Sequence, residues 1–201
     1  ALPLDYTAYI LTGMIPWLAI NESLAKSCTA ITGNTNLVKQ VVFPLEVLPV
    51  KGVLATLFPQ LICLAILVIY VLATGGGLHW TYVFLPVLVA LQLLMMVGIS
   101  FLLAALSPFF RDLKDFVQVY CVIGIYLVPV VYLPNMVPNI FRPFVYVNPF
   151  SYPIWCFRDL CYYGRLEHPW AWVVMIALSI GSYTAGYRLF MRLKPYFGNV
   201  L

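Results

Sequence analysis

Charged residues are scarce in this sequence of 201 residues. Asp, Glu, Lys and Arg make up 9% of the chain, whereas 63% of the residues are hydrophobic. Soluble domains carry roughly 25% charged residues, so this composition excludes a water-exposed globular surface. No charge occurs at positions 52–110, 116–141 or 169–187. These gaps predict membrane-spanning helices, each of which needs about 20 apolar residues.

The sequence also lacks the short motifs of common enzymes. It has no Gly-Lys dipeptide, and therefore no GxxxxGK[ST] phosphate-binding loop, and it has neither HExxH nor GxSxG. Its five cysteines form no CxxC pair. We therefore expect no catalytic residue, no metal and no cofactor in this chain. The carboxylates of Asp159 and Glu167 are expected to pair with Arg158 and Arg165 rather than to serve in acid–base chemistry.

Five apolar segments are predicted to cross the membrane, which gives an all-α polytopic helix bundle in a single domain, 1–201. They cover residues 6–30, 53–74, 82–106, 116–133 and 170–189. A Pro-rich outer segment, 134–165, holds two apolar pieces that are too short to cross, which is typical of re-entrant helices. Glu22 and Lys26 are four residues apart in the first span and are expected to pair. The alternative is a role for them in the transport path.

Basic residues are distributed unequally between the two sides of these spans. One side carries eight of them and the other only three: Lys26, Lys39, Lys51, Arg111, Lys114, Arg188, Arg192 and Lys194, against Arg142, Arg158 and Arg165. The excess of Lys and Arg predicts that the first side is cytoplasmic. Ala1 then lies outside, so we expect one further span before it and six spans in the intact protein.

The cytoplasmic loop of residues 34–50 predicts a short amphipathic helix. Asn34 can cap the helix, and Leu37, Val38 and Val41 fall on one face of it before Pro44 ends it. Such a helix is suited to transmitting the movement of a partner protein to the bundle. The pattern alone fits an interfacial linker equally well.

Four motifs, in order along the chain, resemble one family. They are NLVKQVVFPLEVLPV (36–50), SPFFRDLKDFVQV (107–119), LVPVVYLPNMVPNIFRPFVYVNPFSYPIWCFRDLCYYG (127–164) and RLKPYFGNVL (192–201). They are similar to the permease subunits of type-2 ABC exporters of polysaccharide, above all the O-antigen, lipopolysaccharide and teichoic acid export permeases. The resemblance implies an N-terminal amphipathic helix and a first span before the region seen here.

The resemblance also implies partners and sites. A homodimer of permeases would sit on two cytoplasmic ABC ATPase subunits, which bind the ATP and Mg²⁺. The ATPase-coupling residues would be Asn36, Leu37, Val38, Lys39, Gln40, Val41, Phe43, Pro44 and Glu46, and a second cytoplasmic contact would use Phe109, Phe110, Arg111 and Asp112.

The substrate implied is a glycan on polyprenyl pyrophosphate, exported across a bacterial inner membrane. Its path or exit is predicted at Tyr126, Tyr132, Tyr146, Tyr152, Trp155, Arg158 and Tyr162, because aromatic faces suit sugar rings. Arg142, Arg158, Arg165 and the inner basic residues are candidates for contacting pyrophosphate or anionic lipid headgroups. Membrane lipids are expected partners, and nucleic acid is not. The alternatives are a type-2 ABC permease for teichoic acid, capsule or a smaller lipid or drug, and a membrane scaffold or enzyme.

Overall fold

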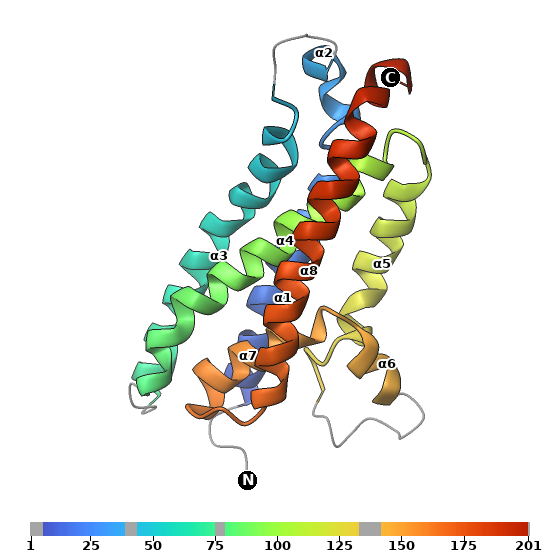
Figure 1. Cartoon of the computed structure of the whole chain (residues 1–201). Coiled ribbons are helices and arrows are strands. Elements are labelled where there is room, and N and C mark those ends of the chain that lie inside the picture. Colours follow the sequence, from blue (N-terminus) through green and yellow to red (C-terminus); the bar gives the residue numbers. More distant parts are fainter. Residues whose placement is uncertain (1–5, 39–43, 75–78, 133–141, 201) are drawn as a thin grey trace.

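The computed structural model describes residues 6–38, 44–74, 79–132 and 142–200, and within these ranges every regular element is a helix. The all-α fold class is therefore confirmed. Five longer helices run alternately up and down (Figure 1): α1 (Tyr6–Thr29), α3 (Val47–Ala73), α4 (Leu85–Leu106), α5 (Leu113–Leu127) and α8 (Pro169–Leu193). The short helices are α2 (Thr35–Val38), α6 (Arg142–Val147), α7 (Ser151–Arg158) and α9 (Phe197–Val200).

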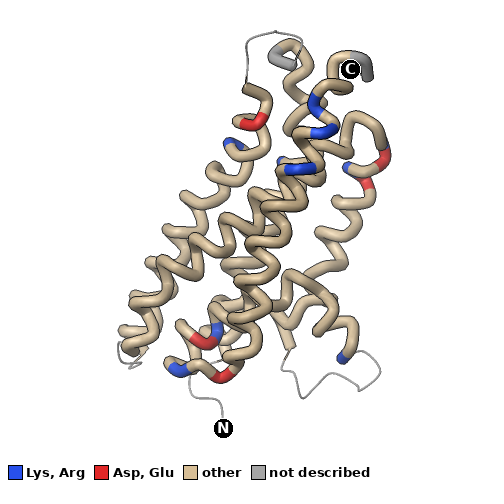
Figure 2. The backbone as a smooth tube through the Cα atoms, in the orientation of Figure 1, with Lys and Arg blue, Asp and Glu red and all other residues tan. Residues whose placement is uncertain are grey.

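The bundle has two distinct ends, which we name after their short helices. The α2/α9 end, at the top of Figure 1, also holds the start of α3 and the start of α5. The α6/α7 end, at the bottom, also holds the start of α1 and the start of α8. Most charged residues lie near one end or the other, and the middle of the bundle is nearly free of them (Figure 2). This separation fits an apolar slab between two polar surfaces.

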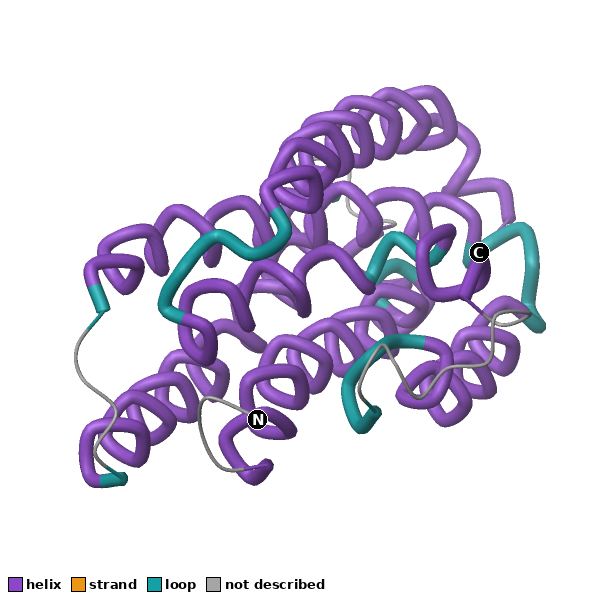
Figure 3. The backbone as a smooth tube through the Cα atoms, turned by 90° about the horizontal axis from the view of Figure 1, so that it is seen from below, coloured by secondary structure: helices purple, strands orange, loops and turns teal. Residues whose placement is uncertain are grey.

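Helices α1 and α4 occupy the centre of the bundle. α1 packs against α3, α4, α5 and α7, and α4 makes its most extensive contact with α8. Seen from below, the described chain is a bundle of helices joined by loops (Figure 3). Apolar side chains cover much of the outer surfaces of α3 and α8; Phe58, Ile69 and Val173, for example, are exposed. Such surfaces suit lipid rather than water.

Three helical stretches of the described residues are long and apolar enough to cross a membrane: Val47–Ala73, Trp80–Leu106 and Pro169–Tyr196. The other two expected spans correspond to α1 and α5. α1 has 24 residues but includes Asn21, Glu22 and Lys26, whereas α5 has 15 residues. The predicted pairing of Glu22 with Lys26 is confirmed, with 2.7 Å between their carboxylate and ammonium groups.

Two helix boundaries differ most from the expected ones. α5 ends at Leu127, whereas the expected span ran to residue 133, and Val128 has extended backbone. Pro129 explains this, because the residue before a proline avoids helical geometry and proline itself has no N–H to donate. α3 begins at Val47, ahead of the expected residue 53. Pro49 lies in its first turn, where the missing N–H has no helical acceptor and so costs nothing.

Candidate functional site

The α2/α9 end holds the part of the expected coupling segment that the structure describes. Asn36, Leu37 and Val38 lie in α2, and Asn36 is exposed. Pro44 is exposed just before the turn that leads into α3. The predictions for Lys39, Gln40, Val41 and Phe43 fall outside the described residues. The chain on both sides of these four residues therefore lies at one end of the bundle (Figure 1).

A cluster of buried apolar side chains underlies this end, and we call it the Phe cluster. Its buried members are Ala30, Ile31, Leu45, Leu48, Phe101, Ala104, Ala105, Phe190 and Phe197. The cluster joins the end of α1, the start of α3, the end of α4, the end of α8 and the tail. The ring of Phe109 in the 107–112 loop lies 6.3 Å from that of Phe197. The two predicted cytoplasmic contacts thus meet the C-terminal tail at a shared core.

An ion pair ties the start of α3 to the tail. The Lys194 ammonium lies 2.6 Å from the Glu46 carboxylate, although 148 residues separate them in the sequence. The hydrogen bond from Lys194 lowers the pKa of the Glu46 carboxyl below its ordinary value. Glu46 is one of the predicted ATPase-coupling residues; its carboxylate holds the tail, and its role in coupling stays a prediction. Nothing in the local sequence signals this pairing.

The second predicted contact lies on the surface of the same end. Phe110 is 62% exposed, and Arg111 and Asp112 beside it are also exposed. None of the ion pairs between described residues involves Arg111 or Asp112. An exposed aromatic ring beside charged groups is typical of a surface that another protein covers.

The α6/α7 end is built around a buried arginine. Arg158 is 1% exposed, its guanidinium lies 3.7 Å from the ring centre of Tyr9, and its Nη2 donates to the Val130 carbonyl at 2.8 Å. Its Nε and Nη1 are buried without a hydrogen-bond partner among the described residues. The predicted pairing of Arg158 with Asp159 is wrong, because consecutive helical residues point in different directions.

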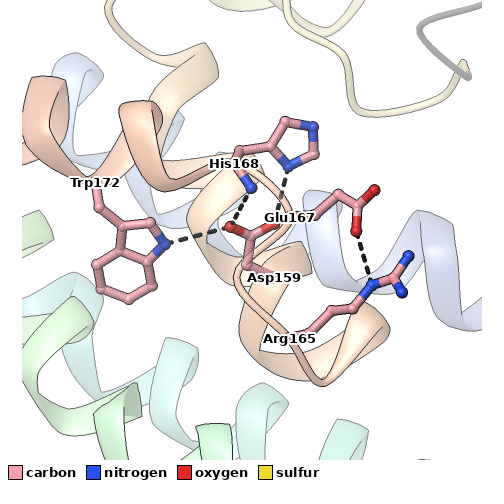
Figure 4. A network of polar contacts seen from close by, with 5 residues as sticks. All are labelled: Asp159, Arg165, Glu167, His168 and Trp172. Atoms are coloured by element: carbon pink, nitrogen blue, oxygen red, sulfur yellow. Dashed lines mark hydrogen bonds and ion pairs between the residues drawn. The ribbon is translucent and has the colours of Figure 1, made fainter.

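Asp159 instead organises the start of α8 (Figure 4). Its fully buried carboxylate accepts hydrogen bonds from the His168 backbone N–H at 3.0 Å and from Trp172 Nε1 at 3.3 Å, and lies 2.9 Å from His168 Nδ1. Gly164, with φ 61°, reverses the chain between these groups, a geometry that favours glycine. The predicted pairing of Glu167 with Arg165 is confirmed at 2.7 Å. The described residues bring together no metal-binding group of three ligands.

The aromatic residues predicted for the substrate path differ in exposure. Tyr126 is 73% exposed and Tyr146 is 48% exposed, whereas Tyr132 and Tyr152 are half-buried. Trp155, Tyr162 and also Arg158 are buried. Trp155 lies among the rings of Tyr146, Tyr152 and Trp170 at centroid distances of 5.3, 5.5 and 5.0 Å. Burial suits a supporting role for these three residues, and the path itself stays a prediction.

A bundle of apolar helices with charged residues at its two ends defines a polytopic membrane protein. The family model described as ABC-2 type transporter matches residues 4–162. The chain belongs to this family and is an ABC-2 transporter permease. It is similar to two O-antigen export system permease proteins RfbA from Klebsiella pneumoniae, each 27% identical over 199 residues, which is 98% of this chain and 76% of the relative. A protein of the same description from Myxococcus xanthus is 28% identical over 128 residues, or 64% of this chain and 49% of that relative.

Proposed function

We propose that this chain is the membrane-spanning subunit of an ATP-driven exporter that moves lipid-linked polysaccharide of the O-antigen type across a bacterial inner membrane. The observation that carries the proposal is the similarity to O-antigen export permeases over 98% of the chain. A match of this extent includes both ends of the bundle and all five longer helices. The direction of movement is from the cytoplasm to the periplasm, with the α2/α9 end in the cytoplasm because basic residues are more numerous there.

A separate ABC ATPase subunit binds ATP and Mg²⁺ in this proposal and docks on the α2/α9 end. The exposed Asn36 and Phe110 support docking there. Asn36 lies in α2, ahead of the start of α3, and Phe110 follows Phe109, whose ring lies beside Phe197 of the Phe cluster. Movement of the coupling segment would pass through Leu45 and Leu48 into α3, and through Phe197 into α8. The ATPase can shift the equilibrium between two permease conformations only under one condition. In a given nucleotide state it must bind one conformation with a more favourable free energy than the other.

A second copy of the chain completes the channel, with α5 at the interface. α5 packs chiefly against α1 and leaves a broad apolar face exposed: Phe116, Val119, Val122, Ile123 and Tyr126. Two such faces opposite each other would remove these side chains from lipid and place Tyr126 at the junction, where its ring could contact sugars. The exposed Arg142 and Arg165 at the far end suit contact with pyrophosphate, and Arg165 also pairs with Glu167. The guanidinium of Arg158, in contrast, is buried and donates to the Val130 carbonyl.

Co-purification with the candidate ATPase tests the function. The permease is expressed with the ABC ATPase encoded beside it and purified by a tag on the permease, and ATP hydrolysis is measured with and without lipid-linked glycan. We expect a stable complex whose hydrolysis rate changes with the glycan. A permease that purifies alone and never engages an ATPase would contradict the proposal and favour a scaffold or an enzyme.

A double substitution tests the docking surface separately. Leu37→Asp with Val38→Asp should abolish retention of the ATPase, because charge would replace the apolar residues predicted to enter the ATPase cleft. The control is Arg165→Gln with Glu167→Gln at the opposite end, which should leave retention unchanged. Normal retention of the ATPase by the Asp variant, with an unaltered elution volume of the permease, would contradict the assignment of this segment as the ATPase-coupling segment.

A further inference from the structure

A groove opens beside the α2/α9 end, on the outer surface of the bundle between α3, α4 and α8. It has a volume of about 710 Å³, within the range of small-molecule sites. Its lining residues are Glu46, Val47, Val50, Lys51, Leu54, Ala55, Phe101, Tyr183 and Tyr187. Along α3 it extends from Glu46 to Ala55, a rise of about 13 Å at 1.5 Å per residue. It therefore runs from the charged end of the bundle into the apolar zone.

The deeper walls of this groove are apolar and aromatic. Leu54 lines the groove and is 51% exposed. The rings of Tyr183 and Tyr187 are stacked with centroids 6.1 Å apart, and Phe101 packs edge-on against Tyr187 at 5.7 Å. Flat rings and aliphatic side chains at this depth match a hydrocarbon chain better than a polar solute.

The mouth of the groove carries one uncompensated positive charge. Lys51 is exposed, and none of the ion pairs between described residues includes it. The one carboxylate of the lining, Glu46, is neutralised by Lys194 at 2.6 Å. The start of α3 adds the partial positive charge of a helix N-terminus. A ligand that fits both parts must therefore join an anionic head to an apolar tail.

We propose that this groove binds an anionic phospholipid of the membrane leaflet at the α2/α9 end. Its phosphate lies against the Lys51 ammonium, and one acyl chain follows Leu54, Phe101 and Tyr187 into the bilayer. The site is separate from the proposed glycan path, because α3 and α8 form its walls and α5 takes no part in it. A bound lipid bridges α3 and α8 beside the Glu46–Lys194 pair. It therefore contacts the two helices through which movement of the coupling segment is proposed to pass.

Native mass spectrometry of the detergent-solubilised protein tests the site with two lipids of identical acyl chains, phosphatidylglycerol and phosphatidylcholine. We expect phosphatidylglycerol to bind more tightly, and Lys51→Gln to weaken it about fivefold, since one Lys near an anionic surface contributes about that factor. Leu54→Trp, which fills the groove, should reduce the binding of both lipids. A phosphatidylglycerol analogue with a diazirine in its acyl chain should crosslink to the peptides that contain Leu54 and Tyr187.

The control is Lys51→Arg, which keeps the positive charge at the mouth of the groove and should leave the preference for phosphatidylglycerol unchanged. Equal binding of the two lipids by the wild type, or unchanged phosphatidylglycerol binding in Lys51→Gln, would overturn the proposal. Displacement of phosphatidylglycerol by a much lower concentration of polyprenyl pyrophosphate would also overturn it, because the groove would then belong to the export substrate. None of these results depends on an ATPase or on transport. The lipid site can therefore be disproved without affecting the proposed function, and the proposed function can be disproved without affecting the lipid site.

Discussion

Gly98 on α4 and Gly186 on α8 lie where these two helices make their closest approach. A Cβ on Gly98 would overlap the backbone of Ser182 and Tyr183, and a Cβ on Gly186 would overlap the Gly98 carbonyl oxygen. The Ser179 hydroxyl donates to the Leu91 carbonyl at 2.8 Å along the same seam. Small residues let helices approach closely in membranes, where dispersion and hydrogen bonds replace the hydrophobic drive.

Gly98→Val and Gly186→Val should therefore each destabilise the bundle by about 1–3 kcal/mol or more through overpacking. The matched control is Gly181→Ala on the same helix, where a Cβ would meet nothing within 4 Å. The control should be neutral or slightly stabilising, since alanine is the better helix former. Thermal unfolding in detergent gives the comparison, and equal midpoints for all three variants would show that the seam is not tightly packed.

Arg158→Met should cost about 2–4 kcal/mol, because it removes the contact with the Tyr9 ring and leaves the Val130 carbonyl without its donor. Met is shorter but has a similar volume, so the loss reports on the charge and the hydrogen bond more than on an empty cavity. Arg142→Gln at an exposed position is the control. If the two variants unfold at the same temperature, Arg158 is not a structural anchor.

Of the three pairs predicted between residues close along the chain, two are correct and that of Arg158 with Asp159 is wrong, and the pairs distant along the chain were not predicted. Glu22 with Lys26 and Arg165 with Glu167 were predicted correctly, because helix or turn geometry brings such neighbours together. The bond between Arg158 and Val130 spans 28 residues and depends on how α7 packs in the bundle relative to the chain that follows α5. Tertiary packing sets such a contact, and a single sequence carries no signal for it.

At the scale of helices, a buried pair of amides links α1, α3 and α4. Gln60 Nε2 donates to Gln92 Oε1 at 2.7 Å, and Gln92 Nε2 reaches the Pro16 carbonyl at 3.4 Å. Gln92→Leu should destabilise by about 1–2 kcal/mol, since it leaves the Gln60 amide unpaired in the core. The double variant Gln60→Leu with Gln92→Leu should be less harmful than the single one, because no polar group then stays buried alone. Unfolding curves in which the two losses simply add would contradict this.

The Glu46–Lys194 pair should hold the tail to α3 in a pH-dependent way. Because the pKa of Glu46 is lowered in the folded state, its stabilising effect is fully present above the ordinary carboxyl value of 4.5 and is lost as the pH falls through the lower, folded-state value. Spin labels at the exposed Val47 and Tyr196 should show a narrow distance distribution at neutral pH that broadens in acid. With Glu46→Gln the distribution should already be broad at neutral pH and insensitive to acid.

The apolar segments that the sequence predicted all contain helices, because lipid leaves few other ways to satisfy backbone hydrogen bonds. Their limits were less predictable. Pro129 explains the end of α5, yet Pro59 lies within α3 without ending it. Neighbouring helices can compensate a missing hydrogen bond inside a membrane bundle, so proline alone does not fix a boundary there. The π-helical turn Asp159–Tyr163 has no sequence signature that we could have used.

The distribution of basic residues over the whole molecule predicts its orientation in the membrane. Seven described basic residues near the α2/α9 end and three at the other end favour a cytoplasmic α2/α9 end: Lys26, Lys51, Arg111, Lys114, Arg188, Arg192 and Lys194, against Arg142, Arg158 and Arg165. In a cysteine-free background, Lys114→Cys and Arg192→Cys should react with a membrane-impermeant maleimide only after the cells are permeabilised. Arg165→Cys should react in cells whose inner membrane is intact.

This result bears on both proposals. Docking of a cytoplasmic ATPase requires Phe110 and the coupling segment to face the cytoplasm, and the lipid groove would then draw on the inner leaflet, which is the leaflet in contact with Lys51. If Lys114→Cys reacts from outside and Arg165→Cys does not, the bundle is inverted, and an ATPase could not reach α2. The lipid site would survive that inversion with its leaflet exchanged, whereas the exporter mechanism would not, so topology separates the two proposals.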